Sequence, residues 1–286
     1  MLTPTLVALA MLLAIAVLSL WLPLRRASAW AIALGAVGIA ALVTGAVTPV
    51  GIAVVLLLIA LCAARERTSA TWLRVLLMAA IVVIALAMAL HQAPGFHNPL
   101  IARDVMEGAA PVTQYINLDK AVAGIVLIAF FGIPARSRAD WRAVARAWPI
   151  IAATPVIVLG LALLTGVVTW APKLPPSTAT FLLSNLLITC VAEEAYFRAL
   201  IQRGLTNVLA GWRYGVAVAI GVTSILFGIA HAGGGVPMIL LATLAGIGYG
   251  LALWRTGRIE AAILAHFAVN ALRFLLVAGP VVVRPA

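Results

Sequence analysis

Two adjacent glutamates interrupt an otherwise apolar stretch of the chain. The sequence contains only eight acidic residues, and Glu193 and Glu194 are the two that fall inside a long hydrophobic run, FLLSNLLITCVAEEAYFRALI. A carboxylate in the hydrocarbon of a bilayer costs at least about 2.5 kcal/mol, even on a lenient insertion scale. This cost indicates that the two side chains have a specific task.

The spacing of the nearest basic residue separates the two glutamates. Arg198 lies four residues after Glu194 and so shares its helical face, where an acid that precedes a base is favourable. Glu193 points about 100° away from Glu194 on a helix. Tyr196 and Phe197 occupy the positions three and four residues after Glu193, so it has no basic neighbour there. We expect Glu194 to be a structural partner of Arg198 and Glu193 to be the freer carboxylate.

Histidine is the second rarity, because only two of the four histidines lie within or at the end of apolar runs. His231 ends the run SILFGIAH, with Phe227 one helical turn before it. His266 has Asn270 one turn after it, on the same helical face. The carboxamide of Asn270 can hold the imidazole or donate a hydrogen bond beside it.

A carboxylate, two imidazoles and a carboxamide are the parts of a hydrolase that activates water. Glu193 would take a proton from water, and neutral His and Asn side chains would stabilise the oxyanion of a tetrahedral intermediate. The same Glu193, His231 and His266 could instead bind zinc as a three-ligand set. Because the helical HExxH arrangement is absent, the sequence favours catalysis without metal or another cofactor. Cys190, in the same run, is expected to pack as a small apolar side chain.

The elements that must position these residues are membrane helices. Of the 286 residues, 65% are hydrophobic and 9% are charged, whereas a soluble domain carries about 25% charged residues. We predict an all-α fold, a polytopic transmembrane helical bundle with about 8–10 membrane segments. The apolar runs are 2–23, 28–48, 50–64, 72–90, 121–135, 149–170, 179–201, 214–231, 236–254 and 259–278.

The formal charge of +11 does not indicate a nucleic-acid partner, because the basic residues recur in short clusters at every second connection, beginning with Arg25 and Arg26. This pattern is typical of topology signals in a lipid bilayer. Residues 91–120 form the longest polar connection, which we predict to lie outside the membrane. We divide the chain into N-terminal transmembrane segments with this loop (1–120) and a transmembrane core (121–286). Residues 136–148 are predicted to lie along the membrane surface.

Three motifs resemble a known family. EEAYFR at 193–198 resembles its EExxxR motif, FGIAH at 227–231 its FxxxH motif, and HFAVN at 266–270 its HxxxN motif. Together they are similar to the CAAX prenyl protease and bacteriocin-processing family (CPBP, also called ABI). The resemblance covers about residues 180–275.

This resemblance implies a type II CAAX protease-like intramembrane endopeptidase of the glutamic type, without a metal or other cofactor. Glu193 would activate water, and His231, His266 and Asn270 would position water or stabilise the oxyanion. The supporting residues would be Glu194, Arg198 and Phe227. It further implies a membrane-embedded or membrane-anchored peptide or protein substrate, which could be lipidated, and a multi-pass protein of the bacterial inner membrane.

Two other classes of protein could use the same residues. A proton-coupled transporter also places Glu, Arg and His inside the membrane, but it would need an internal repeat. The N-terminal half contains no second element like the paired glutamates. A membrane immunity protein that binds a partner without hydrolysing it is the other alternative.

Overall fold

The structure is a computed structural model that describes residues 3–22, 28–104 and 112–279. The basic cluster at Arg25 and Arg26 and residues 105–111 of the long polar connection lie outside the described residues. The predicted all-α transmembrane fold is confirmed. Among the described residues, six helical stretches are long and apolar enough to cross a membrane: Pro49–Arg67, Thr71–Ala89, Arg138–Leu164, Thr178–Val208, Ala232–Thr256 and Ile259–Leu276. Three shorter apolar helices accompany them: Pro4–Ser19, Ala29–Val43 and Gly215–Ile229.

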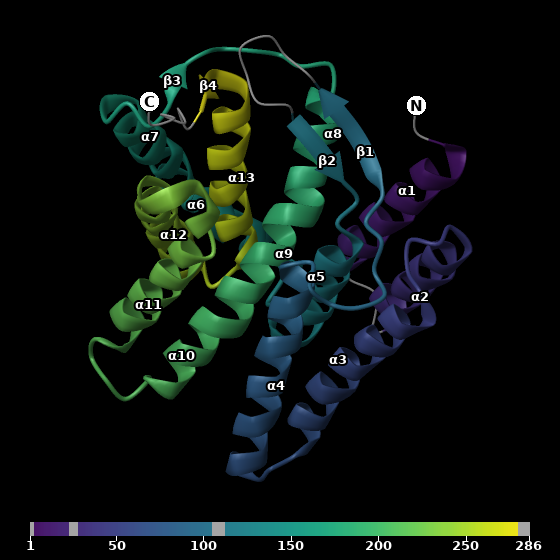
Figure 1. Ribbon diagram of the computed structural model, residues 1–286. Coiled ribbons are helices and arrows are strands. Elements are labelled where there is room, and N and C mark those ends of the chain that lie inside the picture. The colour runs from purple at the N-terminus through teal and green to yellow at the C-terminus, as the bar shows by residue number, and fades with distance from the viewer. Residues whose placement is uncertain (1–2, 23–27, 105–111, 280–286) are drawn as a thin grey trace. The chain divides into compact units, whose positions relative to one another are not determined.

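The chain forms two compact units, and each collects segments that are distant in the sequence. The first unit comprises Met1–Ile101, Gln114–Arg136 and Leu187–Leu200. Its helices are α1 (Pro4–Ser19), α2 (Ser28–Val43), α3 (Pro49–Arg67), α4 (Thr71–Ala89), α5 (Leu118–Phe131) and α9 (Val191–Glu194) (Figure 1). Both α1 and α3 begin with a proline that follows a threonine. Proline is favoured there because its fixed φ suits the first helical position, where no N–H is needed.

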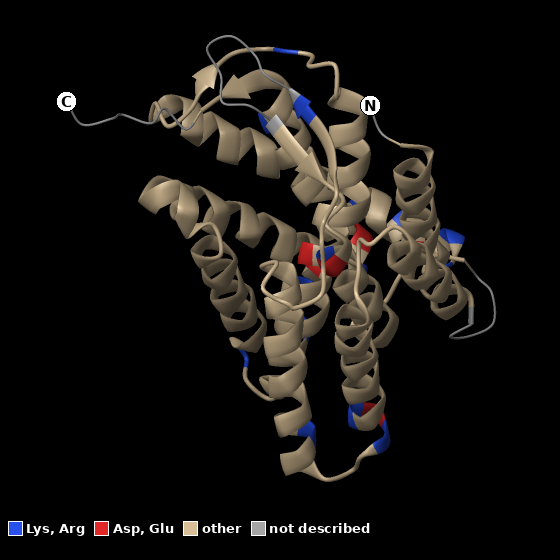
Figure 2. Cartoon of the chain, turned by 45° about the vertical axis from the view of Figure 1, so that its right-hand side comes forward, with Lys and Arg blue, Asp and Glu red and all other residues tan. Residues whose placement is uncertain are grey.

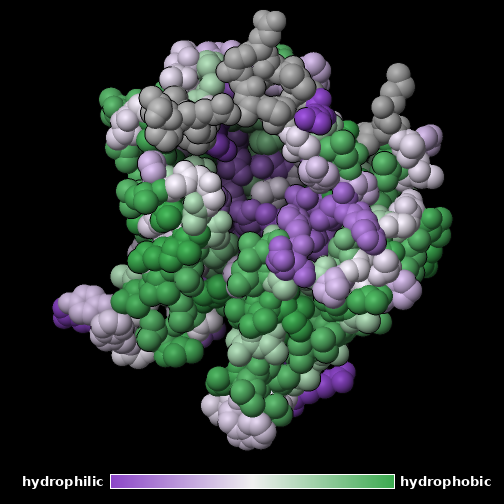
Figure 3. All heavy atoms as spheres, in the orientation of Figure 1, coloured by the Kyte–Doolittle hydropathy of each residue, from purple (hydrophilic) through white to green (hydrophobic). Residues whose placement is uncertain are grey.

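The helices α3 and α4 show how the membrane shapes the first unit. Their connection carries Arg65 and Arg67 in the last turn of α3 and Arg74 in the first turn of α4. Figure 2 shows basic residues, in blue, at this turn. Hydrophobic side chains such as Val75 and Val83 are exposed along α4, and its surface is green in Figure 3. An apolar shaft with a basic end is the pattern of a membrane helix hairpin.

The polar connection after α4 contains two short strands, β1 (Leu100–Asp104) and β2 (Val112–Tyr115), which form a two-stranded sheet. Before β1 the chain turns back onto the start of α3. Gly95 has a positive φ of 84°, and a Cβ built on Gly51 would lie only 2.6 Å from the carbonyl oxygen of Gly95. The described part of the connection therefore packs closely on a helix end.

The second unit comprises Ala102–Thr113, Ser137–Leu186 and Ile201–Ala286. Its helices are α6 (Arg138–Arg146), α7 (Trp148–Leu164), α8 (Thr178–Ser184), α10 (Arg203–Val208), α11 (Gly215–Ile229), the 3₁₀ turn η3 (Ala232–Gly234), α12 (Gly235–Thr256) and α13 (Ile259–Leu276). The strands β3 (Thr169–Trp170) and β4 (Val277–Ala278) pair antiparallel.

Helix α6 is short, and polar contacts fix its start. Ser137 and Asp140 form a capping box at its start, which satisfies two backbone N–H groups. Asp140 also accepts a hydrogen bond from Arg258 at 2.6 Å, which ties α6 to the turn between α12 and α13. Arg142 and Arg146 are exposed on this helix.

Glycines allow α11 and α12 to pack closely. A Cβ on Gly246 of α12 would lie 3.1 Å from Cα of Ser224 in α11, and one on Gly250 would lie 3.0 Å from the side chain of Ile220. Small residues four apart are a common helix-packing device in membranes because they bring two backbones together. The element AGIGYG therefore serves helix packing.

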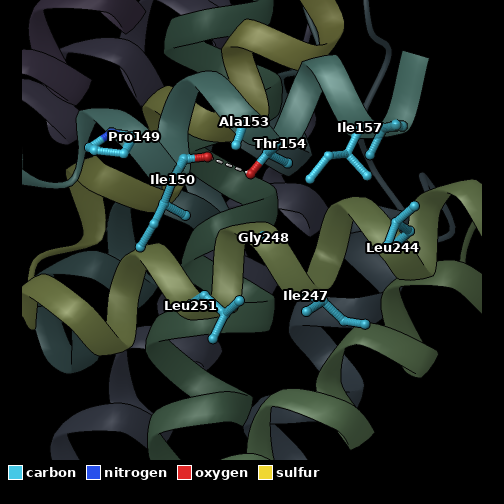
Figure 4. A pocket seen from close by; sticks show the side chains of 10 residues that line it. Pro149, Ile150, Ala153, Thr154, Ile157, Leu244, Ile247, Gly248 and Leu251 are labelled. Carbon is cyan, nitrogen blue, oxygen red and sulfur yellow. Dashed lines mark hydrogen bonds between the residues drawn. The ribbon is translucent and has the colours of Figure 1, made fainter. Parts of the chain in front are cut away.

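A cavity of about 320 Å³ lies between α7 and α12 (Figure 4). Its lining is apolar except for Thr154, whose hydroxyl donates to the carbonyl of Ile150 at 2.7 Å. None of the residues of the three motifs lines it. This cavity is therefore separate from the residues of the three motifs.

Candidate active site

The paired glutamates lie in the middle of one unbroken helical stretch, Thr178–Val208. Within it, the α-helical turn α9 is flanked on both sides by π-helical turns, η1 (Asn185–Cys190) and η2 (Ala195–Gln202). A π-helical turn bonds residues five apart and is rare, and it occurs frequently at functional sites. The local backbone geometry therefore sets the segment around Glu193 and Glu194 apart from the ordinary spans.

Glu194 is neutralised on its own helix. Its Oε2 lies 3.0 Å from Nε of Arg198, and both side chains are fully buried, with 0% exposure. The spacing of four residues predicted this pair. Removal of either partner would leave the other charge buried and unpaired, which is strongly destabilising.

Glu193 is bound by a cation from a different helix. Its Oε1 accepts a hydrogen bond from Nζ of Lys120 in the first turn of α5, at 2.6 Å. The two side chains are 15% and 14% exposed. Glu193 was expected to be the freer carboxylate because no basic residue lies within one helical turn of it, but its cation lies 73 residues away along the chain.

The close approach of α5 to α9 makes this contact possible. A Cβ built on Gly124 would lie 2.7 Å from Cα of Ala192, so the two backbones meet with no room for a side chain between them. Lys120 is one turn before Gly124, and Glu193 directly follows Ala192. The lysine and the carboxylate are therefore brought together by the same helix crossing.

In the second unit, His266 lies in an aromatic cluster. It is buried, with 2% exposure, and its ring stacks on Tyr249 of α12 with centroids 4.6 Å apart. Phe227 of α11 meets His266 edge-on at 5.5 Å. No motif or spacing in the sequence had indicated Tyr249, although it lies inside the glycine-rich element of α12.

His231 follows α11 and also contacts Phe227, with ring centroids 4.6 Å apart. Phe227 therefore lies against both histidines, which gives a structural basis for its place in the FxxxH motif. Nδ1 of His231 lies 2.8 Å from the backbone oxygen of Phe227. A carbonyl oxygen only accepts, so Nδ1 carries the hydrogen and the neutral ring presents Nε2 as an acceptor.

Asn270 lies one turn after His266 on α13, and its Nδ2 donates to Oδ1 of Asn185 at 3.2 Å. Asn185 begins the π-helical turn η1 and is 8% exposed. This second carboxamide was also missed, because a single Asn in an apolar run carries no spacing signal of its own.

The described residues include no group of three or more His, Cys, Asp or Glu side chains that could hold a metal ion. Chelation and elemental analysis distinguish the zinc alternative from the metal-free mechanism. The structure thus places Glu193, Glu194 and Arg198 in the first unit, and Phe227, His231, His266 and Asn270 in the second.

The chain was compared with protein families, curated proteins and solved structures. Residues 175–272 match the family described as type II CAAX prenyl endopeptidase Rce1-like, and all three motifs fall inside the match. No curated protein matches the chain, and no solved structure does. The resemblance indicated by the motifs is thereby confirmed: residues 175–272 carry the signature of the Rce1-like family of type II CAAX prenyl endopeptidases, within a multi-pass membrane protein.

Proposed function

We propose that the chain is an intramembrane endopeptidase that hydrolyses a peptide bond of a membrane-associated or lipidated protein, with water activated by Glu193. The observation that carries this proposal is the family match. Its 98-residue span, 175–272, includes the paired glutamates, His231, His266 and Asn270. The described helices add that the chain is built for a bilayer.

In the proposed reaction, the carboxylate of Glu193 takes a proton from water, and the resulting hydroxide attacks the carbonyl carbon of the scissile bond. His266 and Asn270 donate hydrogen bonds to the oxygen that becomes negative. Glu193 then returns its proton to the leaving amine as the C–N bond breaks. Every proton that leaves the water is thereby accounted for.

The tautomer of His231 supports a role different from that of His266. With Nδ1 donating to the backbone of Phe227, Nε2 of the neutral ring accepts hydrogen bonds. Such an atom can hold the attacking water but cannot donate to an oxyanion. We therefore assign water positioning to His231 and oxyanion stabilisation to His266 and Asn270.

Glu194, Arg198 and Phe227 are assigned supporting roles. The buried Glu194–Arg198 pair would keep the helical stretch around Glu193 rigid, and Phe227 would hold both histidine rings. The proposed location is the bacterial inner membrane, where the substrate would be an embedded or lipid-anchored peptide.

The test is a cleavage assay with the full chain in lipid vesicles. The substrate is a synthetic peptide that ends in a farnesylated cysteine followed by three residues. Glu193→Gln preserves the shape of the side chain and removes the proton acceptor, so we expect a loss of turnover of about 10²-fold or more. Glu66→Gln, at the exposed end of α3, is the matched control and should leave turnover unchanged. Turnover by Glu193→Gln equal to that of the wild type would refute the mechanism.

A further inference from the structure

The partner of Glu193 is chemically unusual for this chain. Of its 19 basic residues, only Lys120 and Lys173 are lysines. Arginine presents a planar fork that suits bidentate contacts, whereas lysine presents one compact charge on a flexible stem. The contact to Glu193 is of the second kind, because Nζ of Lys120 approaches Oε1 at 2.6 Å.

The backbone that carries Lys120 is itself held in place. The carboxylate of Asp119, 1% exposed, accepts hydrogen bonds from the Lys120 N–H at 2.8 Å and from Nδ2 of Asn98 at 3.0 Å. Nδ1 of His91 lies 2.9 Å from the same carboxylate. Asn98 also accepts from the Leu118 N–H at 2.8 Å. These side chains accept hydrogen bonds from N–H groups at the start of α5, which have no partner within the helix, and so fix the position of this helix end.

All of these residues precede the family match, which begins at residue 175. His91, Asn98, Asp119 and Lys120 belong to the polar connection and to the first turn of α5. The contact between Gly124 and Ala192 then transmits their position to α9. A cation that acts on Glu193 is thus supplied by a part of the chain to which the motifs assign no role.

We propose that Lys120 is a positioning residue for Glu193, held by the cluster of His91, Asn98 and Asp119. This inference rests on the proposed role of Glu193 as the base. The ammonium group stabilises the ionised carboxylate in an apolar surrounding and fixes the direction of its Oε1. When Glu193 takes a proton from water, its own charge disappears while that of Lys120 stays, which favours the new negative charge on the oxyanion.

The test compares Lys120→Met and Lys120→Arg in the same vesicle assay. Lys120→Met retains the aliphatic stem without the charge, and we expect kcat to fall on the order of 10²-fold, the effect of a misplaced catalytic group. KM should stay within about twofold, because a positioning residue acts through Glu193 and not on the substrate. Lys120→Arg should restore a substantial part of kcat, since it returns the charge with a different shape.

The control is Lys173→Met, which removes the other lysine; Lys173 donates to the backbone oxygen of Val277. Its kcat should equal that of the wild type. If Lys120→Met yields little folded protein, Lys120→Gln takes its place, because it keeps a hydrogen-bond donor without the charge. A kcat within twofold of the wild type in the neutral variant overturns the inference.

A second readout does not depend on turnover. Thermal unfolding of Lys120→Met, Glu193→Gln and the double variant forms a double-mutant cycle, and we expect the double variant to be clearly more stable than the sum of the single effects predicts. Strict additivity would overturn the pairing. Equal cleavage by the wild type and Glu193→Gln would refute the proposed function, whereas cleavage that depends on Glu193 but survives Lys120→Met would refute this inference alone.

Discussion

The region where α5 meets α9 and the region formed by α11, α12 and α13 hold their polar groups in opposite ways. The first uses full charges: two glutamates are each matched by a cation at 3.0 Å or less. The second uses rings and neutral amides, with His266 stacked on Tyr249 and Asn270 bonded to Asn185. Both regions are largely buried.

The difference matches what each region has to supply in the proposed hydrolysis. A base must be ionised before the reaction, and a nearby cation favours that state. Groups that stabilise a developing oxyanion need to be oriented donors, and a rigid aromatic wall orients an imidazole without adding charge. The buried Glu194–Arg198 pair should therefore respond to mutation through stability, whereas Glu193 with Lys120 and the neutral region should respond mainly through turnover.

The largest expected effect on stability belongs to Arg198→Ala. It leaves Glu194 buried without its cation, and we expect the free energy of unfolding to fall by about 3–5 kcal/mol. Thermal unfolding in detergent and the yield of folded protein measure this effect. Arg138→Ala, at an exposed position of α6, is the control. A normal melting temperature for Arg198→Ala would show that the Glu194–Arg198 pair does not stabilise the fold.

In the neutral region, His266→Ala should act on turnover. Loss of one oxyanion donor lowers kcat by about 10²-fold, and we expect this with the protein still folded. His97→Ala removes an exposed histidine and should have no effect. Comparison of kcat for the two variants at equal folded concentration makes the test. An unchanged kcat for His266→Ala would remove it from the mechanism.

A smaller effect is expected where the two backbones of the charged region meet. Gly124→Ala forces a methyl group against Ala192, and overpacking of this kind costs about 1–3 kcal/mol. Because the same crossing brings Lys120 to Glu193, turnover should also fall. Gly160→Ala in α7, where a Cβ has no neighbour within 4 Å, should be neutral or slightly stabilising. Equal stability of both variants would contradict the close crossing.

The smallest effect is expected from chelation. In the metal-free mechanism, Glu193 is the base, His231 positions the water and His266 donates a hydrogen bond to the oxyanion. A strong chelator then leaves turnover unchanged, and elemental analysis finds no stoichiometric metal. If these three side chains bind zinc, activity is lost on chelation and returns with added zinc. One zinc per chain, lost together with activity, would replace the glutamic mechanism with a metal mechanism.

Local patterns were enough to predict the helical membrane fold and the Glu194–Arg198 pair. Apolar runs correspond to helices because an unsatisfied backbone is excluded from lipid, and a spacing of four residues sets two side chains on one face. Lys120, Tyr249 and Asn185 were not predicted, since their contacts depend on which helices pack together. The family motifs pointed to Phe227, but its position against both histidines became visible only in the fold.

The contact between Lys120 and Glu193 also has a consequence for hydration. Lys120 is two residues beyond Leu118, where α5 begins, so at 1.5 Å per residue it lies about 3 Å along the helix from the polar connection. Because the Lys120 side chain reaches Glu193 directly, the carboxylate also lies close to the polar connection. The water consumed in each turnover of the proposed reaction then has a short path to Glu193 from the polar connection.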